Sequence, residues 1–355
     1  MPAEPNTVGA MSTRLAGRAH SFPARKPALG WYDEGTPEVT DWEITWALDH
    51  GISFFVPCWY RKKGNLGQPV EHVLGHWLHE GLFNSRYGDR FQFAILWENG
   101  NAIACGVADE DDLLKNLVPY WVEHYFSRPN YLRVGGKPVL FIYRPEELVE
   151  ELGGPEATRA ALDKARQAVR EAGLGGLLIL GEHHHRVDRP VPHLRTLGLD
   201  AAYSYHWPTF CETMPDSLDD PSILAAQRTA WERARDAFGL PTPITASMGW
   251  DSRPWGSSFS KARWRLSPSS FQALLEDARE AARALPGDAI DTQLVLLDNW
   301  NEFAEGHYIA PHREHGFGYL DAVRAAFAPG AAPHQDLVPE DIGLGPYNTR
   351  DTAAR

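Results

Sequence analysis

The stretch QLVLLDNWNEFAEGHY, residues 293–308, organises the interpretation of the whole chain. Its first half contains the uninterrupted apolar run 294–297, which is typical of a strand buried on both faces. Within a few residues the character changes to aromatic, amide and carboxylate side chains, and Gly306 ends the turn. A buried strand that delivers such groups at its carboxyl end is typical of an α/β-barrel active site.

Glu302 and Glu305 form a candidate acid–base pair because they are three residues apart. If they enter a helical turn, their Cβ atoms share one face at a separation of roughly 5–6 Å. Carboxylates that close cannot ionise independently, so one should hold its proton to higher pH, as glycoside hydrolysis requires. The alternative is a solvated first helical turn with two ordinary glutamates. The flanking Trp300, Phe303 and Tyr308 favour a site, because aromatic walls suit sugar faces.

Composition narrows the classes of function. The chain has 355 residues, of which 23% are charged and 43% hydrophobic, an ordinary globular mixture without an apolar run long enough to span a membrane. Its net charge of −13 disfavours nucleic acid and acidic membrane surfaces as partners and leaves a neutral polar ligand open. Cys58, Cys105 and Cys211 show no CxxC spacing, and residues 1–22 lack the apolar region of a signal peptide. We therefore expect reduced thiols and a cytoplasmic protein.

Strand-like and helix-like segments alternate along the chain. Predicted strands cover residues 8–11 (a weak first strand), 52–60, 91–101, 136–145, 175–185, 201–207, 243–251 and 293–297. Predicted helices cover residues 37–50, 71–82, 109–126, 155–172, 221–238, 268–284 and 319–327. Eight such strands predict a closed (β/α)₈ TIM barrel. The alternative is a doubly wound open sheet, which usually carries a glycine-rich phosphate turn, and neither GxGxxG nor GxxxxGK[ST] occurs here.

The predicted organisation is a single barrel domain with an extension at each end. Residues 1–30 form an N-terminal arm that contains the weak first strand. Residues 31–328 form the barrel, and residues 329–355 form a proline-rich tail that is laid on the surface or partly disordered.

Several strings resemble one known family. WNEFAEGHY, followed by GFGYLDAV, resembles the WNEWxEG signature of glycoside hydrolase family 99-like proteins, which include sequences labelled WbsX-type glycosyltransferases. The strings GWYDEGTPEVTDWEITWALDHGISFFVPCWY, FQFAILWEN, NYLRVGGKPVLFIYRP and MGWDSRPW resemble other parts of the family, so the resemblance covers about residues 31–327. The chain departs from the pattern at Phe303, where the family often has Trp, at residues 309–312, which replace an acidic run, and in the weak first strand.

The resemblance implies a fold and a mechanism. The family is similar to retaining endo-acting α-mannosidases, which are (β/α)₈ barrels. By position, Glu302 would be the base that deprotonates the 2-hydroxyl of the sugar, which then forms a 1,2-anhydro sugar. Glu305 would protonate the leaving oxygen and then activate water. No cofactor is implied.

Polar and aromatic residues at the predicted strand ends are the candidates for sugar binding. They are Trp59, Tyr60, Trp97, Glu98, Asn99, Tyr143, Arg144, Glu182, His183, His206, Trp207, Trp250, Asp251, Trp300, Asn301 and Tyr308. We expect at least two of the tryptophans at positions 59, 97, 207 and 250 to line a sugar cleft; the alternative is an aromatic cluster that only packs. The alternatives for the polar residues are a polar cap at Glu98–Asn99 and a structural ion pair at Arg144.

The run of Glu182 and three histidines raises the question of a metal. Neighbouring residues of a strand point to opposite faces, so only Glu182 with His184, or His183 with His185, could converge on an ion. Sugar hydrogen bonding by one histidine is the favoured interpretation, and no metal is predicted.

These observations predict a glycoside hydrolase acting on an oligosaccharide or polysaccharide. Three alternatives remain open: a glycosyltransferase of polysaccharide assembly, a non-catalytic carbohydrate-binding barrel and a metal-dependent hydrolase.

Overall fold

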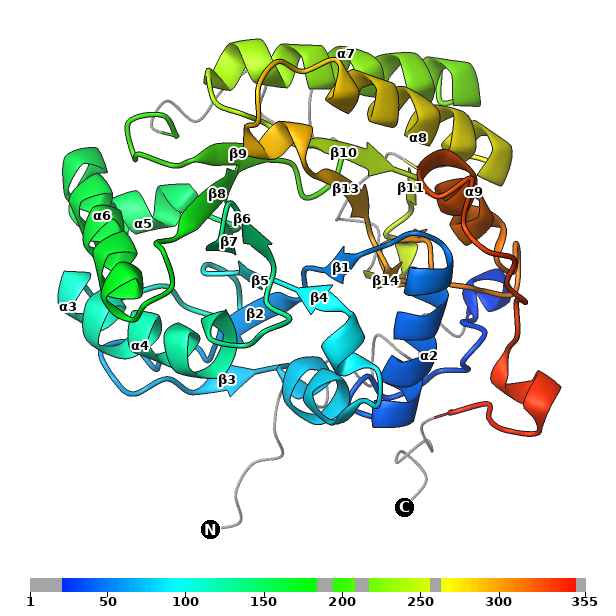
Figure 1. Cartoon of the computed structure of the whole chain (residues 1–355), viewed down its shortest axis with the longest axis horizontal. Coiled ribbons are helices and arrows are strands. Elements are labelled where there is room, and N and C mark those ends of the chain that lie inside the picture. The colour runs from blue at the N-terminus through cyan, green and yellow to red at the C-terminus, as the bar shows by residue number, and fades with distance from the viewer. Residues whose placement is uncertain (1–20, 184–193, 208–216, 256–262, 349–355) are drawn as a thin grey trace.

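A computed structural model describes residues 21–183, 194–207, 217–255 and 263–348. Its parallel strands lie in the middle of the molecule and its helices lie outside them (Figure 1). The strands are β1 (Phe54–Phe55), β2 (Cys58–Arg61), β4 (Gln92–Phe93), β5 (Ile95–Trp97), β7 (Lys137–Ile142), β8 (Leu178–Glu182), β9 (Ala201–Tyr203), β10 (Ile244–Ser247) and β13 (Val295–Asp298). The chain therefore has a mixed α/β fold, as the alternation of apolar segments predicts.

Parallel pairing runs in three groups. One sheet has the order β2-β5-β7-β8-β9, while β1 pairs with β4 and β10 pairs with β13. Across the described residues no pairing joins β13 to β1, and a cavity lies between the two strands. Residues 54–57 and 295–297 are only half-buried because they border this cavity. The predicted first strand, residues 8–11, lies outside the described residues.

Most predicted helices are present. They are α2 (Pro37–Asp49), α6 (Pro155–Glu171), α7 (Asp220–Phe238), α8 (Pro268–Arg283) and α9 (Gly318–Phe327), with the additional short helix α5 (Pro145–Glu151). Residues 110–126 are also helical, through α3 (Glu110–Asp112) and α4 (Val118–Trp121), but wider i→i+5 turns interrupt the α-helical pattern. The sequence explains where α2 begins and ends. Pro37 occupies its first turn, and Gly51, at φ +85°, follows its end.

One predicted helix, residues 71–82, is wrong in its first half. There β3 (His72–Val73) pairs antiparallel with the end of β2, and helical structure begins only at Trp77. The pairing follows the buried Arg61 at the end of β2, which donates to both carboxylate oxygens of Asp112 at 2.7 and 2.9 Å. The backbone of residues 71–73 is thus used for pairing with the end of β2, including the bond from the Lys62 N–H to the Glu71 carbonyl at 2.8 Å, and a contact outside the segment replaces the helix that its local pattern favours.

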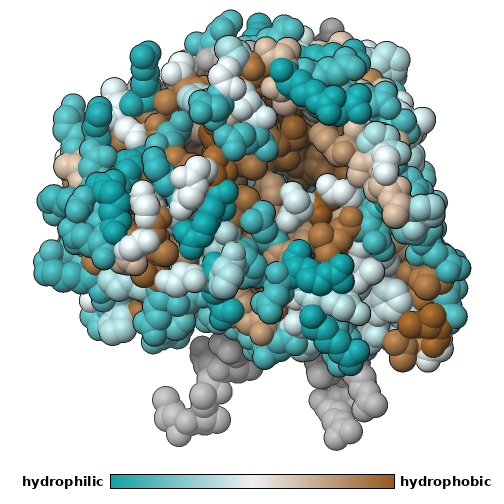
Figure 2. All heavy atoms as spheres, viewed as in Figure 1, coloured by the Kyte–Doolittle hydropathy of each residue, from teal (hydrophilic) through white to brown (hydrophobic). Residues whose placement is uncertain are grey.

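The C-terminal segment contacts α2 and the residues that precede it. Trp46 Nε1 donates to the Leu337 carbonyl at 3.0 Å, and the Tyr347 N–H donates to the Leu29 carbonyl at 2.8 Å. On the face seen in Figure 2, apolar side chains gather in the hollowed middle within a polar rim. Within the described ranges, no helix has the length and apolarity needed to cross a membrane.

Candidate active site

The segment that carries the two glutamates is a β-hairpin. Strand β14 (Asn301–Glu302) pairs antiparallel with β15 (His307–Tyr308), which corrects the predicted helical turn. The Gly306 N–H closes the loop onto the Glu302 carbonyl at 2.9 Å. Gly306 has φ +76°, and a Cβ there would lie 2.6 Å from the backbone N of Asp251. Glycine is therefore required, both for the turn and for its close contact with the segment after β10.

Both glutamates have raised pKa values. Burial raises the pKa of Glu302 to about 8, and the charge of Glu305 adds to the effect. Burial raises the pKa of Glu305 to about 7, with the charge of Asp298 adding to it. The two carboxyl groups thus differ in environment, and Glu302 holds its proton to higher pH. Glu302 lines the cavity, whose volume is about 720 Å³.

His307 holds Glu305 in place. Its Nε2 lies 2.8 Å from Glu305 Oε2, and its Nδ1 lies 3.1 Å from Asn299 Nδ2. Burial lowers the pKa of His307, so the ring is neutral and carries one proton. Asn299 Nδ2 also lies 3.4 Å from Nε2, and a ring that donates Nε2–H to the Glu305 carboxylate leaves Nδ1 to accept from this amide. This bond orients Glu305 and favours its ionised form.

A second polar chain lies behind His307. Asp298, at the end of β13, accepts hydrogen bonds from His206 Nδ1 and Ser247 Oγ. Burial raises the pKa of Asp298 to about 7. Burial lowers the pKa of His206, and the nearby His307 lowers it further. These buried groups fix the base of the hairpin through contacts between β9, β10 and β13.

Helix α2 holds the other side of the hairpin through Glu43. Glu43 is 1% exposed and accepts hydrogen bonds from Trp300 Nε1 at 3.1 Å, Trp77 Nε1 at 3.1 Å and the Tyr32 hydroxyl at 3.0 Å. Burial raises its pKa to about 7. Next to it, Asn301 Nδ2 donates to Glu34 Oε1 at 2.7 Å. Trp300 and Asn301 are thus positioned by carboxylates from a segment more than 250 residues earlier in the chain.

Neutral hydroxyl and thiol groups surround the two glutamates. Burial raises the pKa of Tyr205, and the charges of Glu302 and Glu305 add to this shift. Burial also raises the pKa of Cys58 to about 12, with Glu302 contributing. Both residues line the cavity beside Tyr60. The sequence analysis did not select Cys58, Tyr205, Glu34 or His307. The position of Tyr205, near the carboxyl end of the predicted strand 201–207, was a usable signal.

The sequence-predicted sugar-binding residues divide into two groups. Tyr60, Trp300 and Asn301 line the cavity beside Glu302. The tryptophans at 59, 97, 207 and 250 are each at most 3% exposed, so they match the alternative of an aromatic cluster and not the expected cleft wall. Trp59 Nε1, for example, donates to the hydroxyl of Tyr125 at 2.9 Å. Tyr125 belongs to the helical segment 110–126. These indoles do not line the cavity, because the parallel strands are covered on both faces.

The remaining polar candidates make structural contacts. Asn99 bonds the backbone N and O of Arg144 at 2.8 and 2.9 Å, and the Arg144 guanidinium lies 3.6 Å from Glu98. The ion-pair alternative therefore describes Arg144. Two candidates take part in hydrogen bonds: Glu182 Oε1 accepts from the Tyr205 N–H, and the Tyr308 hydroxyl accepts from Arg265. Two make ring contacts, since His183 stacks on Phe238 and Tyr143 packs against Tyr205. Asp251 forms ion pairs with Arg25 and Arg253.

Three groups among the described residues could hold a metal ion. They are His206–Asp298–His307, His312–Glu314–His315 and His50–Asp321–His334–Asp336. In the first group the ligand atoms already bond one another and Glu305, as described above. Of the histidines considered for a metal from sequence, His184 and His185 lie outside the described residues.

Comparison with known proteins identifies the family. A family model described as Glycosyltransferase WbsX matches residues 12–323. The chain belongs to this family. The curated relatives named Uncharacterized protein WxcX, from two strains of Xanthomonas campestris pv. campestris, B100 and ATCC 33913, are 27% identical over 337 residues. The alignment covers 86% of this chain and 44% of each relative, so the chain spans less than half of their length.

Solved structures of similar fold come from glycoside hydrolases. The GH99 endo-alpha-mannosidase from Bacteroides thetaiotaomicron superposes with a TM-score of 0.56 at 18% identity, over 84% of this chain and 86% of that chain. A chain described as a glycoside hydrolase-like protein gives a TM-score of 0.60 at 17% identity, over 85% and 89% of the two chains. The chain thus has a mixed α/β fold similar to that of the GH99 enzyme, and the family match supports a role in processing glycosyl groups.

Proposed function

We propose that this WbsX-family chain is a glycoside hydrolase that cleaves a glycosidic bond with Glu302 and Glu305. The observation that carries the proposal is the placement of these two carboxyl groups on a hairpin after β13, with pKa values raised to about 8 and about 7. Groups that titrate near neutral pH can both give and take a proton during turnover, as glycoside hydrolysis requires. The proposal includes a closed (β/α)₈ barrel, which the parallel pairing and the similar folds support.

The proposed mechanism is retaining and needs no nucleophile from the protein. One carboxylate deprotonates the 2-hydroxyl of the sugar, which attacks the anomeric carbon and forms a 1,2-anhydro sugar. The other carboxyl group protonates the leaving oxygen and then activates the water that opens the anhydro ring. The resemblance assigns the base to Glu302 and the acid to Glu305, and in the free protein burial raises the pKa values of both carboxyl groups, to about 8 and about 7.

The cavity supplies the groups that would bind the sugar. The Trp300 ring, fixed by Glu43, can stack on a sugar face, while Asn301 and Tyr60 can hydrogen-bond hydroxyl groups. The negative net charge of the chain favours a neutral sugar over an anionic one. Because a similar structure is an endo-α-mannosidase, α-mannosides are the first substrates to test.

The test is a screen of oligosaccharides and aryl glycosides with the wild-type protein, Glu302→Gln and Glu305→Gln. We expect turnover by the wild type, loss of oligosaccharide turnover in both variants while each still unfolds cooperatively, and retention of anomeric configuration by NMR. Wild-type rates in either variant would refute the proposed pair. Glycan binding without turnover in all three proteins would favour a carbohydrate-binding barrel.

The second candidate is glycosyl transfer, which the description of the family favours. A transferase that uses a nucleotide-activated sugar must bind the nucleotide. Calorimetric titration with nucleotide sugars tests this directly, and saturable binding that competes with the glycan would place the transferase first.

A further inference from the structure

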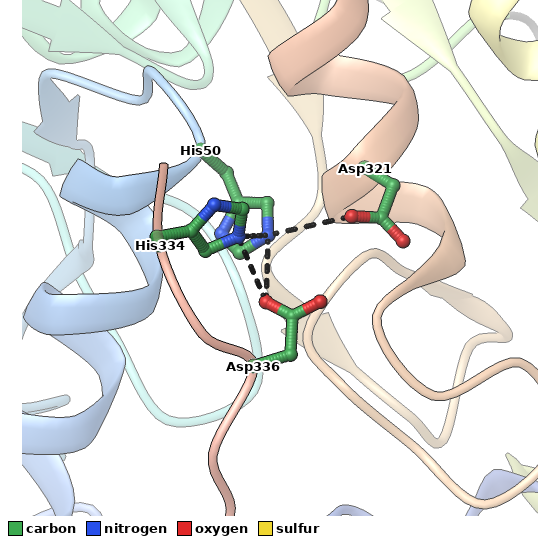
Figure 3. A group of neighbouring side chains, drawn as sticks. All are labelled: His50, Asp321, His334 and Asp336. Atoms are coloured by element: carbon green, nitrogen blue, oxygen red, sulfur yellow. Dashed lines mark hydrogen bonds and ion pairs between the residues drawn. The ribbon is translucent and has the colours of Figure 1, made fainter. Parts of the chain in front are cut away.

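Two histidines and two aspartates converge at the end of the fold where the strands begin, opposite to the hairpin. His50 lies between α2 and β1, and Asp321 lies in the first turn of α9. His334 and Asp336 belong to the C-terminal segment that follows α9. Figure 3 shows the two rings side by side, with both carboxyl groups directed toward them. Three separate segments thus meet at one cluster.

The hydrogen bond on the far side of the His50 ring fixes its tautomer. Nδ1 lies 2.7 Å from the Trp46 carbonyl oxygen, which can only accept, so Nδ1 carries the proton. His50 is completely buried. With the proton on Nδ1, the ring presents the lone pair of Nε2 to the cluster. Histidines that bind metals almost always donate their other ring N–H to such a carbonyl or carboxylate.

The atoms that face this lone pair are one imidazole nitrogen, which can carry a proton, and two carboxylate oxygens, which accept. His50 Nε2 lies 3.2 Å from His334 Nε2, 3.4 Å from Asp336 Oδ1 and 3.8 Å from Asp321 Oδ1. A proton on His334 Nε2 could form a hydrogen bond with only one of its neighbours at a time, either His50 Nε2 or the Asp336 carboxylate. A cation at the centre would satisfy all four atoms together.

The distances fit a tetrahedral ion. Ligand atoms about 2.0–2.1 Å from a tetrahedral zinc are separated from one another by about 3.3 Å. The three distances from His50 Nε2 scatter around this value, and His334 Nε2 lies 2.9 Å from Asp336 Oδ1. All four ligand atoms lie within 4.8 Å of one another. Only small shifts of exposed carboxylates are needed to close the coordination sphere.

We propose that His50, Asp321, His334 and Asp336 form a structural zinc site. Two imidazole nitrogens and two carboxylate oxygens make a complete set of four ligands, as structural zinc sites have. Calcium and magnesium prefer oxygen ligands throughout, so the two histidines select against them.

The site fastens the C-terminal segment to the barrel. Beneath it, α2 and the end of α9 are already in close contact, since a Cβ at Gly51 would lie 2.9 Å from the Ala328 Cβ. His50 and Asp321 come from this rigid base, whereas His334 and Asp336 come from the segment laid over it. Zinc would bridge the two and hold residues 329–338 against α2, away from the glutamate pair.

The test is titration of the chelator-treated full chain with Zn²⁺, followed by calorimetry and thermal unfolding. We expect one zinc ion per chain and a rise in Tm on the order of 5 °C at saturating zinc. Limited proteolysis of residues 329–348 should slow when zinc is added. Replacement by Co²⁺ should give the intense visible absorption of tetrahedral coordination.

Matched variants locate the site. His334→Ala, on the partly exposed segment, should weaken zinc binding by at least 100-fold and abolish the zinc-dependent rise in Tm. His315→Ala, in the other exposed histidine cluster, should leave both unchanged. The proposal is overturned if His315→Ala abolishes binding, if His334→Ala binds as the wild type does, or if Zn²⁺ neither binds nor raises Tm. The last result would show that the cluster shares a proton instead.

Discussion

The two clusters of titratable residues at opposite ends of the strands are assembled in different ways. The Glu302 cluster, which consists of Asp298, Glu302, Glu305 and His307, comes from one stretch, residues 298–307. The His50 cluster joins residues 284 positions apart, such as His50 and His334. The first can therefore be recognised from spacing in the sequence, and the second only from the fold.

The clusters also differ in what burial does to them. At the hairpin, burial raises the pKa values of carboxyl groups, so protons are held at neutral pH. At His50, burial lowers the pKa of an imidazole and leaves a lone pair exposed to the cluster. The first environment suits proton transfer and the second suits a metal ion. The following predictions test this contrast, from the largest expected effect to the smallest.

Removal of either hairpin glutamate should have the largest effect. Glu302→Gln and Glu305→Gln should each lower kcat on an oligosaccharide by about 10²–10⁴-fold, the usual contribution of general acid–base catalysis. The variant that lacks the acid should lose much less activity on an aryl glycoside, whose leaving group needs no proton. Steady-state kinetics on the two substrates identify the acid. Equal losses on both substrates for both variants would contradict the division of roles.

Loss of the bond from His307 to Glu305 should have a smaller effect. His307→Ala should lower kcat by about 10–100-fold, because a misplaced catalytic group loses orientation. Without this donor the ionised form of Glu305 is less stable, so the pKa of Glu305 should rise. The acidic limb of the pH–rate profile should then shift to higher pH. His307→Gln can still present an N–H and should recover part of both effects. An unchanged profile in His307→Ala would show that the ring only packs.

The buried carboxyl of Glu302 should make stability depend on pH. Its folded-state pKa of about 8 lies above an unfolded value of about 4.3, so the folded chain binds more protons between these values. The free energy of unfolding should therefore fall as pH rises from about 4.5 to 8. Glu302→Gln should be more stable than wild type at pH 8, by about 1–3 kcal/mol, and closer to it at pH 5. Urea unfolding at both pH values measures this.

Glu280→Gln is the matched control, because Glu280 lies on the exposed face of α8. It should unfold with the pH dependence of the wild type. The same slope in Glu302→Gln and wild type would mean that Glu302 titrates normally and would weaken its assignment as a catalytic group.

Local signals predict much of the fold. Pro37 and Gly51 mark the ends of α2, and apolar runs mark the strands, because each depends on neighbours in sequence. The orientation of the tryptophans could not be predicted in this way. Strands covered on both faces show no alternation of polar and apolar residues, so the sequence does not tell which face an indole such as Trp59 or Trp97 occupies.

The distinction between local signals and distant contacts also applies to the hairpin that carries Glu302 and Glu305. The spacing of Glu302 and Glu305 identifies two carboxyl groups with shifted pKa values, but their turn is a hairpin and not a helix. Arg25 contributes to this conformation, since its guanidinium donates to the carbonyls of Asp251 and Phe303 at 2.9 Å each. A contact across 278 residues leaves no trace in local pattern, and the same holds for His50 and its partners.

The zinc-dependent part of stability should show the smallest effect and the opposite dependence on pH. Zinc binds neutral imidazoles and ionised carboxylates, so its affinity rises as protons leave these groups. Burial lowers the pKa of His50, which is therefore ready to bind, while burial raises the pKa of the neighbouring Asp321. The rise in Tm on adding zinc should accordingly grow by a few degrees between pH 5.5 and 7.5. Over the same interval the hairpin carboxyl groups lower stability. Thermal unfolding of Glu302→Gln with and without zinc separates the two terms, and a zinc effect that is independent of pH would contradict coordination by these histidines.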